Sequence, residues 1–448
     1  MHILYAHQNY PAQFGHIARN VVQRLKWQCT FVTKANVAHI NDGVRKVIYH
    51  LHGGATERNH YCSRTFENTV WHCDGVYRAL KGQLDIKPDL IVGHSGFGST
   101  LFLRELYPDT PIINFFEFYY HPHGDQSDME FRRDLPWTPS DMTFLRSRCR
   151  NAMILLDLQS CAAGYTPTLF QKSRFPQEYF PRLRVIFDGV DRQIYHAYSD
   201  ELRPPVSRRG TRKIAGIEIS PTTRLVTYVS RGFESMRGFD IFMKAAKLIY
   251  LQYPDVKFLV IGEDKVAYGG DTQHTDNKTF KEWVMDQDQY DADKFAFVGR
   301  VSPVDLGQIL AATDLHIYLT VPFVLSWSMM DAMSCGAVVL ASATAPVMEM
   351  IRDGENGLLA DFFSPDDFAT KALKVLKDPD AFRPLGKAAE ALVKERYSLD
   401  AVMPAMIRMY EDTANRTLRP APADDPMLLL PRDVLTDRRP QNKTPFFG

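Results

Sequence analysis

Two arginines follow an apolar segment in the stretch SRGFESMRGFD. Arg231 and Arg237 come after LVTYVS, and Gly232 and Gly238 beside them let the backbone approach a ligand closely. Guanidinium groups pair with phosphate oxygens through two parallel hydrogen bonds, so this spacing suits a clamp for a diphosphate. A surface loop with two solvated arginines suits it equally, and the residues alone leave both interpretations open.

A single carboxylate lies in the stretch TVPFVLSWSMMDAMSCG, which directly follows the apolar segment DLHIYL. Ser326 is a good N-cap for a helix that Gly336 ends. The backbone N–H groups of Ser326–Ser328 would then face a phosphate. Asp331 lies one turn inside this helix, where its charge suits the helix dipole. On these residues alone, a structural role explains Asp331 better than ligand binding does.

Short apolar segments alternate with longer amphipathic ones in two successive runs. Such a βα rhythm, with strands that are apolar throughout, predicts parallel sheets covered on both faces. The predicted strands are 2–6, 29–32, 89–93, 111–115, 152–156 and 184–187, then 224–232, 257–262, 295–299 and 314–319. Helices are predicted at 15–25 and 240–251, and the polar stretch 263–291 is predicted to be a surface insertion. Ligands of such sheets bind beyond the carboxyl ends of the strands.

Composition excludes several classes of protein. The 448 residues exceed one ordinary core, and 53 Lys plus Arg balance 53 Asp plus Glu. No overall charge therefore draws the chain to nucleic acid. The six cysteines show no metal-binding spacing, which predicts reduced thiols and no metal site. The absence of a signal-like N-terminus or a long apolar segment predicts a cytoplasmic protein.

Several segments in fixed order resemble the retaining family 4 glycosyltransferases. The segment HIYLTVPFVLSWSMMDAMSCGAVVLASATAPVMEMIRDGENGLLADFFSPDDFA resembles their C-terminal half. MHILYAHQNYPAQFGHIA resembles their first strand and loop, VIFDGVD their Asn-Gly-Val-Asp junction, and SRGFESMRGF their phosphate site. Together these pieces cover most of residues 1–415. Three segments, HQNYPAQF, FFEFYYHPHG and the PFVLSW motif, are similar to those of an uncharacterised bacterial subgroup of this family.

The resemblance implies the GT-B fold, in which two Rossmann-like, doubly wound α/β domains face each other across a cleft. The acceptor domain would be 1–195 and the nucleotide-sugar domain 223–398, joined by a linker at 196–222. A helix at 399–418 would cross back to the first domain, and 419–448 would be a tail rich in proline and charge.

The resemblance also implies which residues bind the donor. Arg231 and Arg237 would hold the diphosphate, and Asp331 falls on the second glutamate of the family's Glu-x7-Glu pair, which binds the ribose hydroxyls. Phe323 falls on the first glutamate, which usually holds the sugar. Either backbone amides replace that carboxylate, or activity is reduced, or the donor is unusual. The predicted donor-binding residues are Phe14, Gly15, Gly299, Arg300, Val301, Val324, Leu325, Ser326, Trp327 and Asp331.

Glu117 follows the predicted strand 111–115, where relatives line the active site. With Arg231 and Arg237 it is a predicted catalytic residue, because a carboxylate there can orient an acceptor hydroxyl or stabilise positive charge on the sugar. A buried structural glutamate fits as well. His94, His60 and His121 are predicted acceptor contacts. The arginines of 146–150 suit either an anionic lipid or a solvated helix face.

The predicted activity is metal-independent transfer of a hexose, with retention, from a nucleoside-diphosphate sugar to a glycan or lipid-linked acceptor in polysaccharide or glycoconjugate synthesis. The nucleotide-sugar is the donor substrate, and no further cofactor is expected. Two alternatives stay open: a GT-B nucleotide-sugar epimerase, and a non-catalytic GT-B binding protein suggested by Phe323. Peripheral contact with the inner face of a membrane also stays open, and no nucleic-acid partner is expected.

Overall fold

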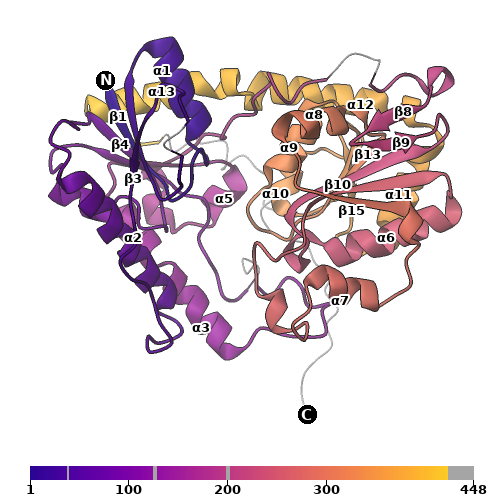
Figure 1. Ribbon diagram of the computed structural model, residues 1–448, viewed down its shortest axis with the longest axis horizontal. Helices are drawn as coiled ribbons and strands as arrows, with labels where there is room; N and C mark the ends of the chain where they lie inside the picture. Colours follow the sequence, from indigo (N-terminus) through magenta and orange to yellow (C-terminus); the bar gives the residue numbers. More distant parts are fainter. Residues whose placement is uncertain (38–39, 125–128, 198–201, 422–448) are drawn as a thin grey trace.

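Two parallel β-sheets form the core of the molecule, one in each half (Figure 1). The computed structural model describes residues 1–37, 40–124, 129–197 and 202–421. Among these residues the first sheet has seven strands, in the order β3-β2-β1-β4-β5-β6-β7, and the second has six, in the order β12-β11-β10-β13-β14-β15. Each sheet has helices on both faces, so the prediction of two doubly wound α/β domains is confirmed.

The first half contains the strands and helices of residues 1–195. Its strands are β1 (His2–Ala6), β2 (Gln28–Thr33), β3 (Arg45–Ile48), β4 (Leu90–His94), β5 (Ile112–Phe115), β6 (Ala163–Thr166) and β7 (Leu183–Val185). Its α-helices are α1 (Gly15–Leu25), α2 (Arg64–Lys81), α3 (Asp141–Arg150), α4 (Ala152–Ser160) and α5 (Leu169–Ser173).

The second half begins with a two-stranded hairpin and then builds its sheet. The strands are β8 (Arg212–Ile214), β9 (Ile217–Ile219), β10 (Arg224–Gly232), β11 (Val256–Glu263), β12 (Phe295–Gly299), β13 (Leu315–Tyr318), β14 (Val339–Ser342) and β15 (Leu358–Ala360). The α-helices are α6 (Phe239–Gln252), α7 (Phe280–Asp286), α8 (Pro303–Ala312), α9 (Trp327–Ser334), α10 (Ala345–Met348), α11 (Pro365–Lys377), α12 (Pro379–Leu392) and α13 (Leu399–Ala414).

One predicted strand is wrong. Residues 152–156, AMILL, lie in helix α4, and the strand of that region is β6, AGYT. Ala, Met and Leu favour helices, and an apolar run of five residues cannot be assigned by periodicity alone. Strand β6 is not predicted from the sequence, because small and polar residues interrupt its apolar pattern.

The segment predicted as a linker, 196–222, contains folded structure. The hairpin β8–β9 packs Ile214 and Ile219 against the second sheet through Leu225 and Leu259. Residues 198–201 of that segment lie outside the described residues. So do residues 422–448, which make up nearly all of the predicted tail 419–448.

The last helix joins the two halves. Near the junction, the amide of Val190 donates to the carbonyl of Tyr397 and the amide of Leu399 donates to the carbonyl of Val190, both at 2.8 Å. Helix α13 then lies over the first sheet, as Figure 1 shows in yellow, and buries Met406 and Tyr410 in its core.

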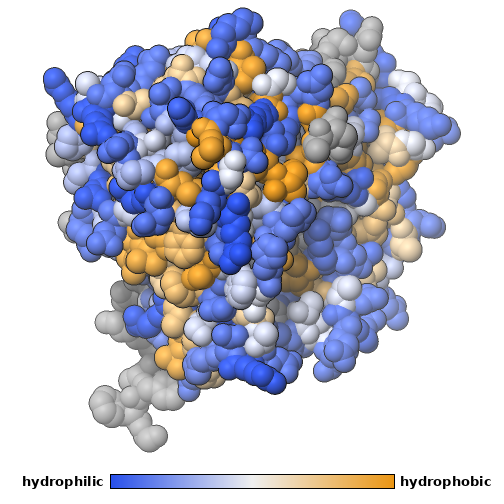
Figure 2. All heavy atoms as spheres, turned by 60° about the vertical axis from the view of Figure 1, so that its left-hand side comes forward, coloured by the Kyte–Doolittle hydropathy of each residue, from blue (hydrophilic) through white to orange (hydrophobic). Residues whose placement is uncertain are grey.

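Among the described residues, no helix has the length and apolar character needed to cross a membrane. Figure 2 shows one face of the molecule, on which hydrophobic side chains form separate patches between hydrophilic ones.

Candidate functional site

Polar and charged side chains follow strands of both sheets at their carboxyl ends, and Glu117 and Arg231 among them were predicted. Glu117 follows β5 and Asp188 follows β7, while Arg231 ends β10 and Thr320 follows β13. Parallel strands bring such positions to one edge of each sheet. The positive charges of Arg237 and Arg231 act on Glu117, so the two edges face each other.

The two arginines of the glycine-containing loop differ in their surroundings. Arg237 is buried, and its Nη1 donates to Thr320 Oγ1 at 2.6 Å and to the Val324 carbonyl at 3.0 Å. The Arg237 guanidinium carbon also lies 5.3 Å from the centre of the Tyr268 ring. The Arg231 side chain is exposed. Arg237 is therefore fixed by the protein, whereas Arg231 is available to a ligand.

The polar stretch 263–291 supports this loop. Asp271 accepts hydrogen bonds from Ser235 N at 2.8 Å and Ser235 Oγ at 2.6 Å, and Glu234 Oε2 accepts from Ala267 N at 2.5 Å and Tyr268 N at 2.7 Å. The buried carboxylates of Asp271 and Glu234 thus hold part of this mainly exposed stretch against the arginine loop.

Glu117 lies beside a neutral histidine. Glu117 Oε2 is 3.7 Å from His94 Nε2. Burial raises the pKa of Glu117 to about 7, and the charges of Arg237 and Arg231 oppose that rise. Burial lowers the pKa of His94 well below its usual value, and its Nδ1 donates to the Ser95 carbonyl at 2.7 Å. The lone pair of His94 therefore resides on Nε2, facing Glu117.

Asp188 is a candidate that the sequence analysis missed. Trp327 Nε1 donates to Asp188 Oδ2 at 2.7 Å, which joins the first half to the start of α9. Burial raises the pKa of Asp188 to about 7, Trp327 opposes the rise, and the charge of Glu117 adds to it. The available signal was the stretch VIFDGVD, where Asp188 stands in place of the asparagine of the family motif.

The start of helix α9 follows the prediction. Ser326 is its N-cap, with Oγ accepting from Ser328 N at 3.3 Å, and Ser326 N donates to Tyr318 Oη at 2.9 Å. Asp331 is buried, and its carboxyl group has no hydrogen bond or ion pair with any described residue. Burial raises the pKa of Asp331 well above its usual value. A partnerless buried carboxyl suits a ligand contact better than a purely structural role.

Phe323 packs against aromatic side chains of both halves. Its ring centre lies 4.6 Å from that of Phe118, in the first half, and 5.5 Å from that of Tyr268, in the second. The side chain is 5% exposed. The position that holds a glutamate in the family pattern is therefore apolar in both its residue and its surroundings.

Other predicted donor contacts can act mainly through the backbone. Phe14 is fully buried in the core of the first half, and an added Cβ at Gly15 would lie 2.1 Å from Pro11 Cβ. The side chains of Val324 and Leu325 are also buried. These positions remain predictions.

The second half offers an open strand end at β12. Gly299 has φ +69°, and an added Cβ there would meet no atom within 4 Å. Arg300 is exposed, whereas Val301 packs against the core beneath the β8–β9 hairpin. Their predicted role at the nucleotide base stays a prediction.

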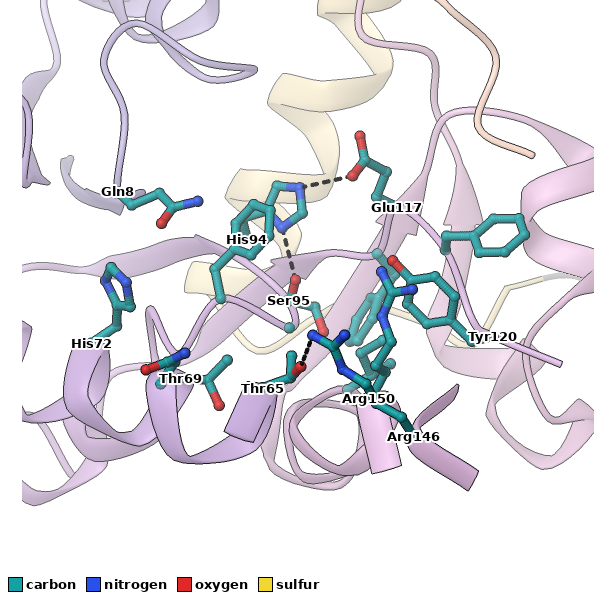
Figure 3. Close-up of a pocket in the computed structure, with 16 residues that line it drawn as sticks. Gln8, Thr65, Thr69, His72, His94, Ser95, Glu117, Tyr120, Arg146 and Arg150 are labelled. Atoms are coloured by element: carbon teal, nitrogen blue, oxygen red, sulfur yellow. Dashed lines mark hydrogen bonds and ion pairs between the residues drawn. The ribbon is translucent and has the colours of Figure 1, made fainter. Parts of the chain in front are cut away.

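Of the three predicted acceptor histidines, the structure places one beside Glu117. A cavity of about 360 Å³ is lined by both His94 and Glu117 (Figure 3). His121 lines a different cavity of about 450 Å³, and its Nε2 donates to the Arg174 carbonyl at 2.6 Å. His60 is exposed and accepts from Cys62 N at 3.3 Å; it lines none of the cavities described here.

Two family models match the chain in succession. Residues 25–195 match the glycosyl transferase family 4 group, and residues 211–392 match the glycosyl transferases group 1. The chain belongs to the family 4 glycosyltransferases. This assignment confirms the resemblance of its motifs, while membership of the PFVLSW subgroup stays a prediction.

Curated relatives of this glycosyltransferase include a synthase and a glycosyltransferase. N-acetyl-alpha-D-glucosaminyl L-malate synthase of Bacillus anthracis is 23% identical over 230 residues, 51% of this chain and 54% of that protein. D-inositol 3-phosphate glycosyltransferase of Mycolicibacterium gilvum is 25% identical over 245 residues, 54% of this chain and 50% of that protein. The chain spans about half the length of the curated relatives it matches.

Solved structures confirm the GT-B fold of the glycosyltransferase. Sucrose-phosphate synthase of Thermosynechococcus elongatus has a TM-score of 0.67 at 16% identity, covering 93% of this chain and 99% of that one. Anabaena HepE in complex with UDP-glucose has a TM-score of 0.62 at 16% identity, covering 92% of this chain and 100% of that one.

Proposed function

We propose that this glycosyltransferase moves a hexose, with retention of configuration, from a nucleoside diphosphate to a hydroxyl group of a glycan or lipid-linked acceptor. The observation that carries the proposal is the position of Glu117. It faces His94 at 3.7 Å within the first half, and it lies in the field of Arg231 and Arg237 from the second. One carboxyl group is thus shared by the acceptor side and the donor side of the cleft.

The donor would bind to the second half. The exposed guanidinium of Arg231 and the N-terminal end of α9 would hold the diphosphate, because a cation and a helix dipole stabilise its charge. Among the amides predicted to face the phosphate, those of Ser326 and Ser328 already donate to Tyr318 Oη and Ser326 Oγ. The Asp331 carboxyl group, which has no partner among the described residues, would accept hydrogen bonds from two ribose hydroxyls. Because these groups already supply positive charge, we propose that no metal ion or further cofactor is needed.

In the proposed transfer, the bond between the anomeric carbon and the diphosphate oxygen breaks while the acceptor oxygen attacks the same face. The acceptor proton passes to the departing diphosphate. Glu117 orients the acceptor hydroxyl, or stabilises the positive charge that develops on the sugar ring. Arg231 and Arg237 stabilise the growing negative charge of the leaving group.

Calorimetric titration with a panel of nucleoside diphosphates tests the donor site. We expect at least one to bind, and we expect Arg231→Ala to weaken diphosphate binding about tenfold while leaving nucleoside binding unchanged. Arg208→Ala, at an exposed arginine of the linker segment, is the matched control. Failure of every nucleoside diphosphate to bind contradicts the proposal.

The reaction itself has two tests. NMR of the product should show the anomeric configuration of the donor, and an inverted product rules out retention. Activity should persist in excess chelator, and loss of activity that a divalent cation restores would disprove metal independence.

Phe323 favours a second candidate function, nucleotide-sugar binding without transfer, because it removes a carboxylate that holds the sugar in the family pattern. Binding of a nucleotide-sugar with neither transfer nor slow hydrolysis would select this candidate. Transfer to any acceptor would exclude it.

A further inference from the structure

Two arginines one helical turn apart on α3 face the acceptor side of the cleft. Arg146 and Arg150 both line the cavity of about 360 Å³ that contains Glu117. They also line a neighbouring cavity of about 380 Å³, which extends toward the second half. Thr65 and Tyr120 are shared between the two cavities as well, so the cavities adjoin at these four residues.

The protein holds both guanidinium groups without neutralising them. The Arg146 guanidinium carbon lies 4.9 Å from the centre of the Tyr61 ring, and its nitrogens donate to Tyr61 Oη and Thr65 Oγ1, each at 3.2 Å. Arg146 Nε is buried and has no hydrogen-bond partner among the described residues. The Arg150 guanidinium carbon lies 3.7 Å from the centre of the Tyr120 ring.

Within the described chain, neither arginine forms an ion pair with a carboxylate, and Arg150 makes no hydrogen bond through its side chain. Aromatic faces and hydroxyl groups orient a guanidinium but leave its charge in place. Two like charges at positions i and i+4 repel each other on a helix. An anion in the cavity would relieve that repulsion and meet two oriented donor groups.

This arginine pair is separate from the donor pair. The charged residues that act on Glu117 are Arg237 and Arg231, from the second half. In Figure 3, Glu117 and His94 lie toward one side of the cavity, and Arg146 and Arg150 lie toward the other with Thr65 and Tyr120. Uncharged polar groups also line this cavity; they are Gln8, Asn68, Thr69 and His72.

We propose that the acceptor is a hydroxyl-bearing anion whose phosphate or carboxylate group binds Arg146 and Arg150 while its reacting hydroxyl lies at Glu117. This inference rests on the proposed function, because it specifies the substrate class of the same site. Guanidinium pairs bind both kinds of oxyanion through charge-assisted hydrogen bonds. The uncharged wall residues then suit the remaining hydroxyl groups of the acceptor.

Arg150→Gln is the decisive variant, because the Arg150 side chain makes no hydrogen bond with any described residue and only stacks on Tyr120 there. Arg148→Gln is the matched control, since Arg148 lies on the same helix, is exposed and lines the separate cavity of His121. Calorimetry would measure binding of three probes: glycerol 3-phosphate, L-malate and uncharged glycerol. We expect at least one anion to bind, glycerol not to bind detectably, and Arg150→Gln to weaken the anion about tenfold.

The two anionic probes identify the oxyanion, because binding of only one of them assigns the acceptor to phosphates or to carboxylates. Arg231→Ala should leave anion binding unchanged, and Arg150→Gln should leave nucleoside diphosphate binding unchanged. The inference is overturned if neither anion binds, or if Arg150→Gln and Arg148→Gln bind the anion equally well. Failure of the proposed function shows separately, as loss of nucleoside diphosphate binding in the wild type.

Discussion

Two carboxyl groups at the cleft, those of Glu117 and Asp188, have raised pKa values. Burial raises the pKa values of Glu117 and Asp188 to about 7, and the charge of Glu117 contributes to the shift of Asp188. Like charges in one site titrate as a pair, so a change at one residue alters the other. The ionisation of this pair therefore falls near neutral pH.

Glu117→Gln should change the pH dependence of transfer. In the wild type, Glu117 is protonated below about pH 7 and becomes a carboxylate above it. Because the proposed role requires the carboxylate, we expect kcat/KM to rise through pH 7 to a plateau. The glutamine variant should be slower by about a hundredfold and should lack this rise. A pH profile from 5.5 to 8.5 measures it, and an unchanged inflection in Glu117→Gln would exclude Glu117 as its source.

The variant Asp188→Asn tests whether the charge of Asp188 affects the ionisation of Glu117. Asparagine keeps an oxygen that accepts from Trp327 Nε1, as Asp188 Oδ2 does at 2.7 Å, but it carries no charge. Removing that negative charge favours ionisation of Glu117, so the inflection of kcat/KM should move to lower pH with activity retained. Asp188→Ala, which also removes the acceptor, is the comparison. A shift to higher pH in Asp188→Asn would contradict the coupling.

Single residues of the site differ in how far the sequence reveals them. The N-cap at Ser326 follows from residue type and position, because capping is local chemistry. The fixed environment of Arg237 does not, since its partners Thr320 and Val324 belong to a loop more than 80 residues away. Asp188 was missed for the same reason: its partner Trp327 is distant in sequence.

At the scale of elements, a buried ion pair ties the linker segment to the second sheet. Arg209 Nη2 and Nη1 donate to Asp314 Oδ1 at 2.5 Å and Oδ2 at 3.1 Å, and both side chains are fully buried. Asp314 Oδ2 also accepts from Leu225 N at 2.9 Å, at the start of β10. The pair therefore connects the chain before the hairpin with two neighbouring strands of the sheet.

Arg209→Ala should destabilise the second half by about 3 to 5 kcal/mol, because it leaves the carboxylate of Asp314 buried without its partner. The neighbouring Arg208→Ala should change stability by less than about 0.5 kcal/mol, since Arg208 is exposed. Urea denaturation followed by circular dichroism measures both. Equal midpoints for the two variants would show that the pair contributes nothing to stability.

Elements with a strong apolar pattern were predictable from the sequence, whereas elements stabilised by tertiary packing were not. Strands β1, β10 and β12 have the predicted bounds, because each is a mainly apolar run next to polar loop residues. Helix α4 was assigned wrongly because a short apolar run suits both states. The β8–β9 hairpin was missed because its three-residue strands are stabilised by packing on the second sheet.

At the scale of the whole molecule, polar contacts join the two halves at several points around the cleft. Arg132, in the first half, pairs with Asp240 at the start of α6, with Nη2 and Oδ2 separated by 2.6 Å. Glu349, in the second half, accepts from the amides of Leu169 and Phe170 at 2.8 Å each. Together with the hydrogen bond from Trp327 to Asp188, these contacts join the two halves.

The Arg132 contact lies beside the loop that carries Arg237. Besides pairing with Asp240, Arg132 Nη1 hydrogen-bonds to the carbonyl of Ser235, two residues before Arg237. Substituting Arg132 alone would leave Asp240 charged and buried, which destabilises the fold regardless of closure. The double variant Arg132→Ala, Asp240→Ala removes both buried charges and so separates the two effects. Asp134, which also accepts from Arg132 Nε and Nη2 at 2.8 and 2.9 Å, has a side chain that is 30% exposed, so water can solvate it in the variant.

We expect the double variant to fold and its two halves to separate more freely, because it lacks this buried bridge. Its radius of gyration by small-angle X-ray scattering should exceed that of the wild type without ligand, and a nucleoside diphosphate should reduce the difference by drawing the halves together. Arg133→Ala is the control, because Arg133 is exposed and its side chain contacts Glu130 of the same half, with Nη2 3.7 Å from Oε2 and Nε 3.1 Å from the carbonyl. If the double variant and the wild type scatter identically, the bridge does not govern closure, and the remaining contacts of Glu349 and Trp327 must hold the halves together.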